Sequence, residues 1–308
     1  MSSAEALTLD RIWIAWTGME TDLIFNHGYD LRSFAAFPML DSEEGRARLR
    51  GYYDAQIQIG GDFGVGIILD TPTWMANPDR ALAVGYKAPD LPRVTRDGVS
   101  LARDAAAARA DVAIRLSVQI GPRGDGYKPG IAAAETAARY HLPQIAAAHE
   151  AGADLVSAYT LGAAGEAIGI SAAARQVGIP ALIAFTIETD GRLADGTPLS
   201  AAVAELVEKA EPEAVVVNCA HPDHVASGLD GGPWQTKLAG IVANASRQSH
   251  AELDAAEALD DGNPEELAGQ LAELRRVLPN LRVLGGCCGT DLRHLRAIAA
   301  RLTAPHPT

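Results

Sequence analysis

The chain contains three cysteines, and each follows a short apolar run with the composition of a buried strand. Cys219 comes after Val215–Asn218, and the adjacent pair Cys287 and Cys288 comes after Val283–Gly286. Three thiolates favour Zn²⁺, which prefers sulfur ligands and tetrahedral coordination. Three protein ligands would leave a fourth position open for a substrate, as in catalytic zinc sites. The sequence therefore predicts Zn²⁺ held by these cysteines.

The residues around the cysteine pair bear on whether both sulfurs can face one ion. Adjacent side chains of a regular strand point to opposite faces. Gly285, Gly286 and Gly289 flank the pair, and residues without a Cβ let the backbone leave strand geometry. Two other interpretations stay open: buried cysteines that pack as small apolar side chains, and a redox pair at Cys287 and Cys288.

Eight apolar runs alternate with Ala-rich segments that show helical spacing, which predicts a single (β/α)8 barrel domain over residues 1–308. A doubly wound sheet is the rival, but no glycine fingerprint follows the first run. The expected strands are Ile12–Trp16, Val65–Leu69, Ala113–Gln119, Asp154–Ala158, Ala181–Ile187, Ala214–Asn218, Leu238–Ala243 and Leu281–Gly285. The expected helices include Leu142–Ala151, Gly165–Val177, Leu199–Ala210 and Pro264–Leu278, with Ser200 and Asn263 as candidate caps.

Two long segments interrupt this alternation. Phe25–Arg50 and Thr71–Arg103 are expected to be loops, with a helix-like stretch at Arg80–Val84 inside the second. Loops that follow barrel strands lie over the carboxyl ends of the strands, where active sites are found. Because the three cysteines also follow strands, we expect them to meet at that end. The tail Thr303–Thr308 is expected to fray.

Composition restricts the partners of the chain. The formal net charge is -13, and nucleic acid binding is not expected without a basic face. We find no apolar stretch of about 18 residues and no secretory signal at the N-terminus, so we expect a cytoplasmic protein without membrane attachment. A homo-oligomer is compatible with the sequence.

The strings around the cysteines, Val217–Cys219 and Gly285–Thr290, resemble the homocysteine S-methyltransferase family. Further similar segments follow in the same order: Gly18–Leu23, Gly121–Tyr127, Phe185–Glu188, Asp195–Leu199 and Ala243–Ser246. The resemblance implies a zinc-containing barrel that transfers a methyl group to the sulfur of homocysteine, giving methionine. It also implies Cys219, Cys287 and Cys288 as the zinc ligands, and it places Thr21 in a loop expected to contact substrate.

Donors differ within this family and include S-methylmethionine, S-adenosylmethionine, betaine and methylated folate used through cobalamin. We expect a small sulfonium or quaternary ammonium donor, because 308 residues leave no room for folate or cobalamin modules. A zinc methyltransferase for a different thiol and a non-catalytic zinc or redox barrel are the alternatives. A Schiff-base enzyme is disfavoured because the candidate lysines lie in loops or polar stretches: Lys87, Lys128, Lys209 and Lys237.

Two positions depart from the family pattern. Trp16 stands where the family has an Asp, and Tyr159 stands where it has a Glu. In the family these acids help to hold the amino group of the acceptor. We expect both aromatic side chains to line the pocket and to favour a methylated cation through their ring faces. The alternative is that they only fill space at the barrel mouth.

Other candidates have both a functional and a structural interpretation. Glu188 is expected to bind the ammonium group of the acceptor, or else to pair with Arg192. Asn218 orients a ligand or the substrate, or else serves as a turn residue at the end of a strand. His221 and His224 follow Cys219 closely, but we expect helix capping or exposure, since the cysteines already supply three ligands.

Overall fold

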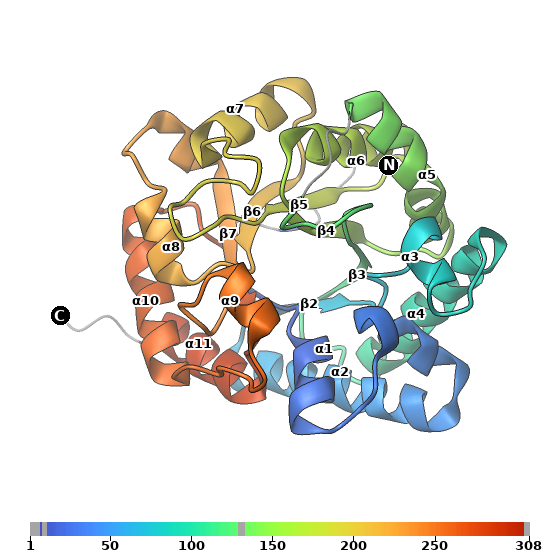
Figure 1. Cartoon of the computed structure of the whole chain (residues 1–308). Helices are drawn as coiled ribbons and strands as arrows, with labels where there is room; N and C mark the ends of the chain where they lie inside the picture. Colours follow the sequence, from blue (N-terminus) through green and yellow to red (C-terminus); the bar gives the residue numbers. More distant parts are fainter. Residues whose placement is uncertain (1–6, 8–10, 129–132, 305–308) are drawn as a thin grey trace.

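The computed structural model describes residues 7, 11–128 and 133–304. Eight parallel strands pair in sequence order, and β8 pairs with β1 to close a barrel that helices surround (Figure 1). The predicted (β/α)8 fold is confirmed. Most of the expected frayed tail, and residues 1–6 and 8–10 of the segment examined for a signal, lie outside the described residues. The strands are β1 (Trp13–Trp16), β2 (Gly66–Asp70), β3 (Ile114–Ile120), β4 (Leu155–Leu161), β5 (Ala181–Phe185), β6 (Ala214–Asn218), β7 (Leu238–Ala243) and β8 (Val283–Gly286).

Most strand residues are apolar because each strand of a parallel barrel is covered on both faces. Every residue of β6 is buried. Alternate residues divide between two cores: Ala15 packs with Tyr159 among residues inside the barrel, whereas Ile14 and Trp16 pack with the surrounding helices. This alternation decides which strand-end side chains can face the barrel mouth.

Helices cover the outside of the barrel (Figure 1). The α-helices are α1 (Met19–Thr21), α2 (Glu43–Phe63), α3 (Pro78–Leu82), α4 (Leu91–Ala106), α5 (Ala134–Glu150), α6 (Ala164–Val177), α7 (Leu199–Lys209), α8 (Pro222–Ser227), α9 (His250–Ala255), α10 (Pro264–Val277) and α11 (Leu292–Thr303). Short π and 3-10 turns lie at Asp22–Asn26, Arg32–Phe34, Phe37–Asp41, Ala88–Asp90 and Pro233–Lys237.

Both expected loops were predicted too long. Helix α2 already begins at Glu43, after Ser42 accepts a hydrogen bond from the Gly45 amide. The second segment contains α4, which the sequence analysis missed because Pro92 and Gly98 are read as helix breakers. Pro92 lies in the first turn, where its missing N–H costs nothing, and Gly98 lets the helix pack closely on Thr71.

The predicted helix caps have mixed outcomes. Asn263 caps α10 by accepting from the amides of Glu265 and Glu266, as expected. Ser200 was wrong as the cap of α7, because that helix begins after Pro198 without a side-chain cap. Within the part of the chain that the structure describes, no helix is long and apolar enough to cross a membrane.

The close contact between β1 and β8, where the barrel closes, leads to a prediction about stability. A Cβ on Gly285 would collide with the backbone carbonyl of Ala15 on β1. We expect Gly285→Ala to lower the free energy of unfolding by about 3 kcal/mol. The matched control is Gly269→Ala in α10, where a Cβ meets nothing within 4 Å. That change should add about 0.5–1 kcal/mol through helix propensity. Urea denaturation of both variants measures the difference, and equal midpoints would contradict the close approach.

Candidate active site

The three cysteine sulfurs meet at the carboxyl end of the barrel, and their Sγ atoms all lie within 4.8 Å of one another. Sγ of Cys219 is 3.6 Å from Sγ of Cys288, too far for a disulfide bond. Sulfurs that share one tetrahedral zinc at about 2.3 Å lie roughly 3.8 Å apart. The predicted convergence of these side chains is therefore present, with a spacing that fits a metal ion.

Contact among the three thiols shifts their pKa values apart. Hydrogen bonding to a neighbouring cysteine sulfur raises the pKa of Cys219 and of Cys288 above the ordinary thiol value, whereas at Cys287 the hydrogen bonds from these two outweigh burial and lower the pKa. Three thiols this close together, two of them buried, cannot all ionise without a cation, whereas metal binding displaces their protons. The donor set, its spacing and its burial thus fit Zn²⁺.

Backbone conformation aims these sulfurs. Cys219 has φ of 52°, in the left-handed region that non-glycine residues rarely adopt. Gly289, with φ of 79°, turns the chain away after the cysteine pair, as expected for a flanking glycine. Gly286 is required for a different reason, since a Cβ there would overlap the Thr290 side chain. Part of the strain therefore falls on a candidate ligand rather than on glycine.

Asn218 lies beneath the cluster and is fully buried. Its Oδ1 accepts from the Thr160 amide at 2.8 Å, and its Nδ2 donates to Thr160 Oγ1 at 3.0 Å and approaches Cys287 Sγ at 3.8 Å. Thr160 has φ of 64°. Asn218 thus ties the end of β4 to the end of β6 below the sulfurs, and it does not line the pocket described below.

A second layer supports Cys219 from the side, and sequence reasoning missed two of its members. The Tyr127 hydroxyl donates to Cys219 Sγ at 3.1 Å, and its ring stacks on His250 with centroids 3.8 Å apart. His250 faces the Cys219 carbonyl through Nε2 at 2.8 Å and the Glu188 carboxylate through Nδ1 at 3.0 Å. Tyr127 ended a segment that resembles the family, which was its only signal in the sequence.

The structural alternative for Glu188 was wrong, because Arg192 donates to the Gly196 carbonyl instead. Of the two histidines near Cys219, His221 caps α8 by accepting from the Asp223 amide, as expected. His224 is half-buried and contacts the Arg247 carbonyl, so it neither caps a helix nor is exposed.

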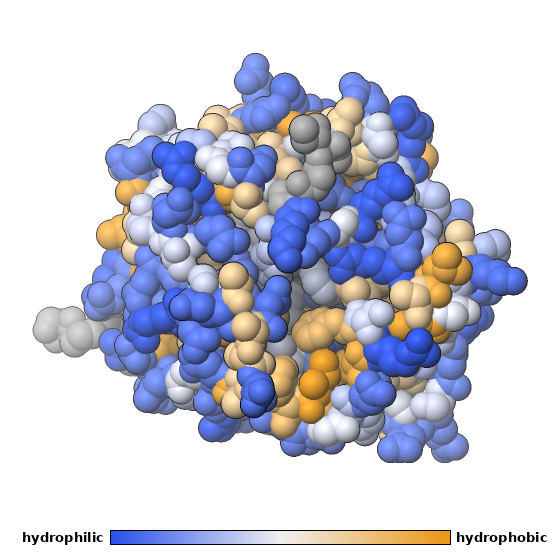
Figure 2. Space-filling model, viewed as in Figure 1, coloured by the Kyte–Doolittle hydropathy of each residue, from blue (hydrophilic) through white to orange (hydrophobic). Residues whose placement is uncertain are grey.

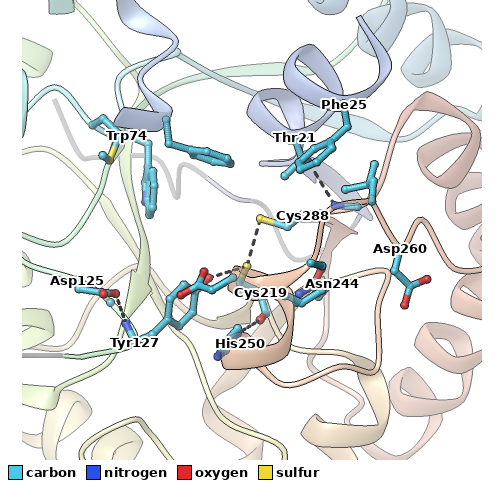
Figure 3. A pocket seen from close by; sticks show the side chains of 18 of the residues that line it. Thr21, Phe25, Trp74, Asp125, Tyr127, Cys219, Asn244, His250, Asp260 and Cys288 are labelled. Carbon is cyan, nitrogen blue, oxygen red and sulfur yellow. Dashed lines mark hydrogen bonds between the residues drawn. The ribbon is translucent and has the colours of Figure 1, made fainter. Parts of the chain in front are cut away.

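A pocket of about 560 Å³ opens over the cluster. Sγ of Cys219 and Sγ of Cys288 face it, with Trp74 on one side and Thr21 and Phe25 on another (Figure 3). The aromatic residues that line it are Phe25, Phe34, Trp74 and Tyr127. Figure 2 shows apolar side chains gathered along one side of the opening on this face. A small substrate can thus reach two of the sulfurs.

The family model of homocysteine S-methyltransferase matches residues 18–302. The chain belongs to the homocysteine S-methyltransferase family. It is accordingly a methyltransferase, and all three cysteines of the cluster lie within the matched residues. The sequence has no significant match among curated proteins.

Solved structures of a family member share the fold. The oxidised homocysteine methyltransferase MmuM from Escherichia coli superposes with a TM-score of 0.75 at 22% identity, covering 94% of this chain and 96% of that chain. The metallated form gives a TM-score of 0.75 at 21% identity, covering 95% and 96%. The apo form gives 0.67 at 20% identity, with the same shares.

The two departures from the family pattern do not line the pocket of this methyltransferase. Trp16 packs against Tyr52 of α2 with ring centroids 5.1 Å apart, and its Nε1 donates to Thr290 Oγ1 at 3.2 Å. Tyr159 points into the barrel and donates to Asp70 Oδ2 at 3.1 Å. Both are buried outside the pocket wall, so their expected role in cation binding is not supported by their positions. Strand alternation turns Trp16 toward the helices.

Thr21 is the one expected substrate residue that lines the pocket directly. Its Oγ1 donates to the Gly18 carbonyl at 2.8 Å and accepts from the Gly289 amide at 3.2 Å. The first-strand loop is thereby fastened to the loop that carries the cysteine pair.

Two buried acids were also missed. Burial raises the pKa of Glu20 and of Asp70 to about 7 in each case. Asp70 lies at the end of β2, and its Oδ1 has no hydrogen-bond partner. The charges of Cys287 and of Asp70 add to the effect of burial at Glu20. Both acids are enclosed rather than facing the pocket.

The raised pKa of Asp70 predicts a pH-dependent stability. Between about pH 4 and pH 7 the native carboxyl keeps its proton while the unfolded chain loses it, so stability falls as the pH rises through this window. Asp70→Asn should therefore gain about 3 kcal/mol relative to the wild type between pH 4.5 and pH 8.

Urea denaturation at both pH values measures this gain, with Asp104→Asn on the exposed face of α4 as the control. A stability difference for Asp70→Asn that stays constant with pH would contradict an enclosed, proton-retaining carboxyl.

Proposed function

We propose that the protein is a zinc-dependent S-methyltransferase that moves a methyl group from a small sulfonium or quaternary ammonium donor to homocysteine. The observation that carries the proposal is the cluster of Cys219, Cys287 and Cys288, two of whose sulfurs face an aromatic pocket. A closed structural zinc site would have a fourth protein ligand. Among the described residues, no fourth Cys, His, Asp or Glu joins the cluster, which supports a site that accepts a substrate sulfur.

Bound zinc would lower the pKa of an acceptor thiol and keep it nucleophilic at neutral pH. The chain supplies the surroundings for this chemistry. Burial raises the pKa of Tyr127 well above its ordinary value, so its hydroxyl stays protonated and donates to Cys219 Sγ. Asn218 approaches Cys287 Sγ from below. Donors to ligand sulfurs orient them and disperse their charge.

The pocket walls suit a cationic donor. The rings of Phe25, Phe34, Trp74 and Tyr127 replace Trp16 and Tyr159 as the aromatic faces available to a sulfonium or quaternary ammonium group. In the reaction, the acceptor sulfur forms a bond to the methyl carbon while the bond from that carbon to the donor heteroatom breaks. The bonding pair stays with the departing donor, which becomes neutral, and the thiol proton passes to solvent. An apolar pocket favours this loss of charge.

A different thiol acceptor is the second candidate, and the positions of Trp16 and Tyr159 favour it. Neither the family's Asp nor its Glu is present to hold an amino group, and the aromatic residues that replace them are buried. Glu188 does not replace those acids in the pocket wall, since its carboxylate contacts His250. A reducing cytoplasmic compartment would keep either site in its thiol form.

X-ray absorption at the zinc edge of the reduced protein, with and without L-homocysteine, tests the proposal. We expect three sulfur neighbours and one lighter atom, changing to four sulfur neighbours when homocysteine is added. Cys288→Ser should lose one sulfur neighbour and lower zinc affinity at least about tenfold. The exposed substitution Ser227→Ala in α8 is the control.

Three sulfurs that do not respond to homocysteine would favour the different acceptor, to be found by screening thiols for methyl transfer. Zinc bound without sulfur neighbours would overturn the metal site.

A further inference from the structure

One wall of the pocket carries a guanidinium group without a strong partner. Arg80 of α3 is half-buried and lines the pocket. Its guanidinium lies 5.5 Å from the centroid of the Trp74 ring, and its Nη1 donates to the Met75 sulfur at 2.7 Å. A thioether is a weak acceptor, so most of the donors of Arg80 remain available.

Two nearby arginines each pair with a carboxylate, in contrast to Arg80. Arg123, on the loop after β3, donates to Asp79 at 2.8 Å and lies over the Tyr140 ring. Arg93 of α4 pairs with Asp41 at 2.7 Å. Within the described residues, no carboxylate forms an ion pair with Arg80. Burial without such a partner lowers the pKa of Arg80, which is the electrostatic cost that an incoming anion would remove.

The other charges that line the pocket are already engaged or open to solvent. Asp125 accepts from the Tyr127 amide, and Asp260 accepts from Ser246 and from the Gly262 amide. Asp254 is exposed. Arg80 is the only Lys or Arg among the residues that line the pocket, all of which belong to the described part of the chain. The pocket therefore offers one fixed positive group on an otherwise acidic and aromatic wall.

We propose that Arg80 binds the carboxylate of a substrate, so that this enzyme acts on a carboxylate-bearing thiol or a carboxylate-bearing methyl donor. This inference rests on the proposed function for the identity of the two substrate classes. The planar fork of a guanidinium matches a carboxylate through two parallel hydrogen bonds. Stacking on Trp74 holds the fork in one orientation while its outer edge stays free.

A phosphate-bearing ligand fits this wall less well. Phosphate groups carry more negative charge and are usually held by several cations or by backbone amides at a helix N-terminus. Here a single guanidinium and the carboxylate of Asp125 line the same pocket, in a chain with a formal net charge of -13. One carboxylate matches that single charge, and a zwitterionic ligand would also meet the acidic residues of the rim.

Binding measurements with matched ligand pairs test the inference without requiring turnover. The acceptor pair is L-homocysteine and 3-aminopropanethiol, and the donor pair is S-methyl-L-methionine and (3-aminopropyl)dimethylsulfonium. The members of each pair differ only by the carboxylate. Isothermal titration of the reduced, zinc-loaded protein gives the four dissociation constants for the wild type, Arg80→Gln, Arg80→Lys and the control Arg123→Gln.

We expect the wild type to prefer the carboxylate-bearing member of at least one pair by about 10- to 100-fold, which is the usual contribution of a charged hydrogen bond. Arg80→Gln should abolish that preference and leave the affinity for the other member unchanged. Arg80→Lys should keep part of it, and Arg123→Gln should keep all of it. The pair that responds identifies whether the acceptor or the donor carries the carboxylate.

Two results would overturn the inference: a wild type that does not discriminate within either pair, and an Arg80→Gln variant that keeps the discrimination. Methyl transfer by the wild type, followed in parallel with the same donors and acceptors, reports on the proposed function separately. Discrimination that depends on Arg80 without methyl transfer would leave a carboxylate site and reject the methyltransferase substrates. Methyl transfer together with discrimination that does not depend on Arg80 would support the proposed function and reject Arg80 as the carboxylate site.

Discussion

The geometry of the site depends on two backbone hydrogen bonds to the end of β7. The Cys219 amide donates to the Val242 carbonyl at 3.1 Å, and the Cys287 amide donates to the Ala243 carbonyl at 2.7 Å. Strand β7 lies between β6 and β8, so its last two carbonyls hold the cysteine loops on both sides at a fixed separation. The sulfur spacing that suits a metal ion thus follows from strand pairing and needs no flexible loop to close.

Around this frame, residues far apart in the sequence restrain each other in pairs. Asn218 fixes the strained turn at Thr160, and Thr21 fastens the first-strand loop to Gly289. His250 of α9 reaches back to the Cys219 carbonyl and carries the ring on which Tyr127 stacks. Strained backbone at Cys219 persists because these contacts restrain it from several sides. These contacts hold Cys219 from the sides away from the pocket, so its sulfur still faces the pocket.

The barrel and the cysteine cluster could be predicted from the sequence, because both depend on local patterns. Buried parallel strands are continuous apolar runs, and residues that follow them share one rim. Helix α4 was missed since Pro92 and Gly98 break helices only away from a first turn or a tight packing contact. Tyr127, His250 and Arg80 could not be found, because their roles arise from contacts between distant segments.

The orientation of Trp16 shows a different limit. A departure from a family motif indicates that a side chain has changed, but not that the new side chain occupies the same space. Trp16 turned outward to Tyr52, and the enclosed acids Glu20 and Asp70 lie where the motif alone gave no signal. To predict that Trp16 points outward, one must know both the strand alternation and the packing of α2.

The pairing of β8 with both β7 and β1 has a consequence for how the protein matures. Two of the three sulfurs lie in the loop directly after the last strand, and that strand completes the ring by pairing with the first. The full ligand set therefore cannot exist in a partly assembled ring that lacks its final strand. A metal ion held by these sulfurs would therefore bind late in folding, and it would tie the loop after β6 to the loop after β8.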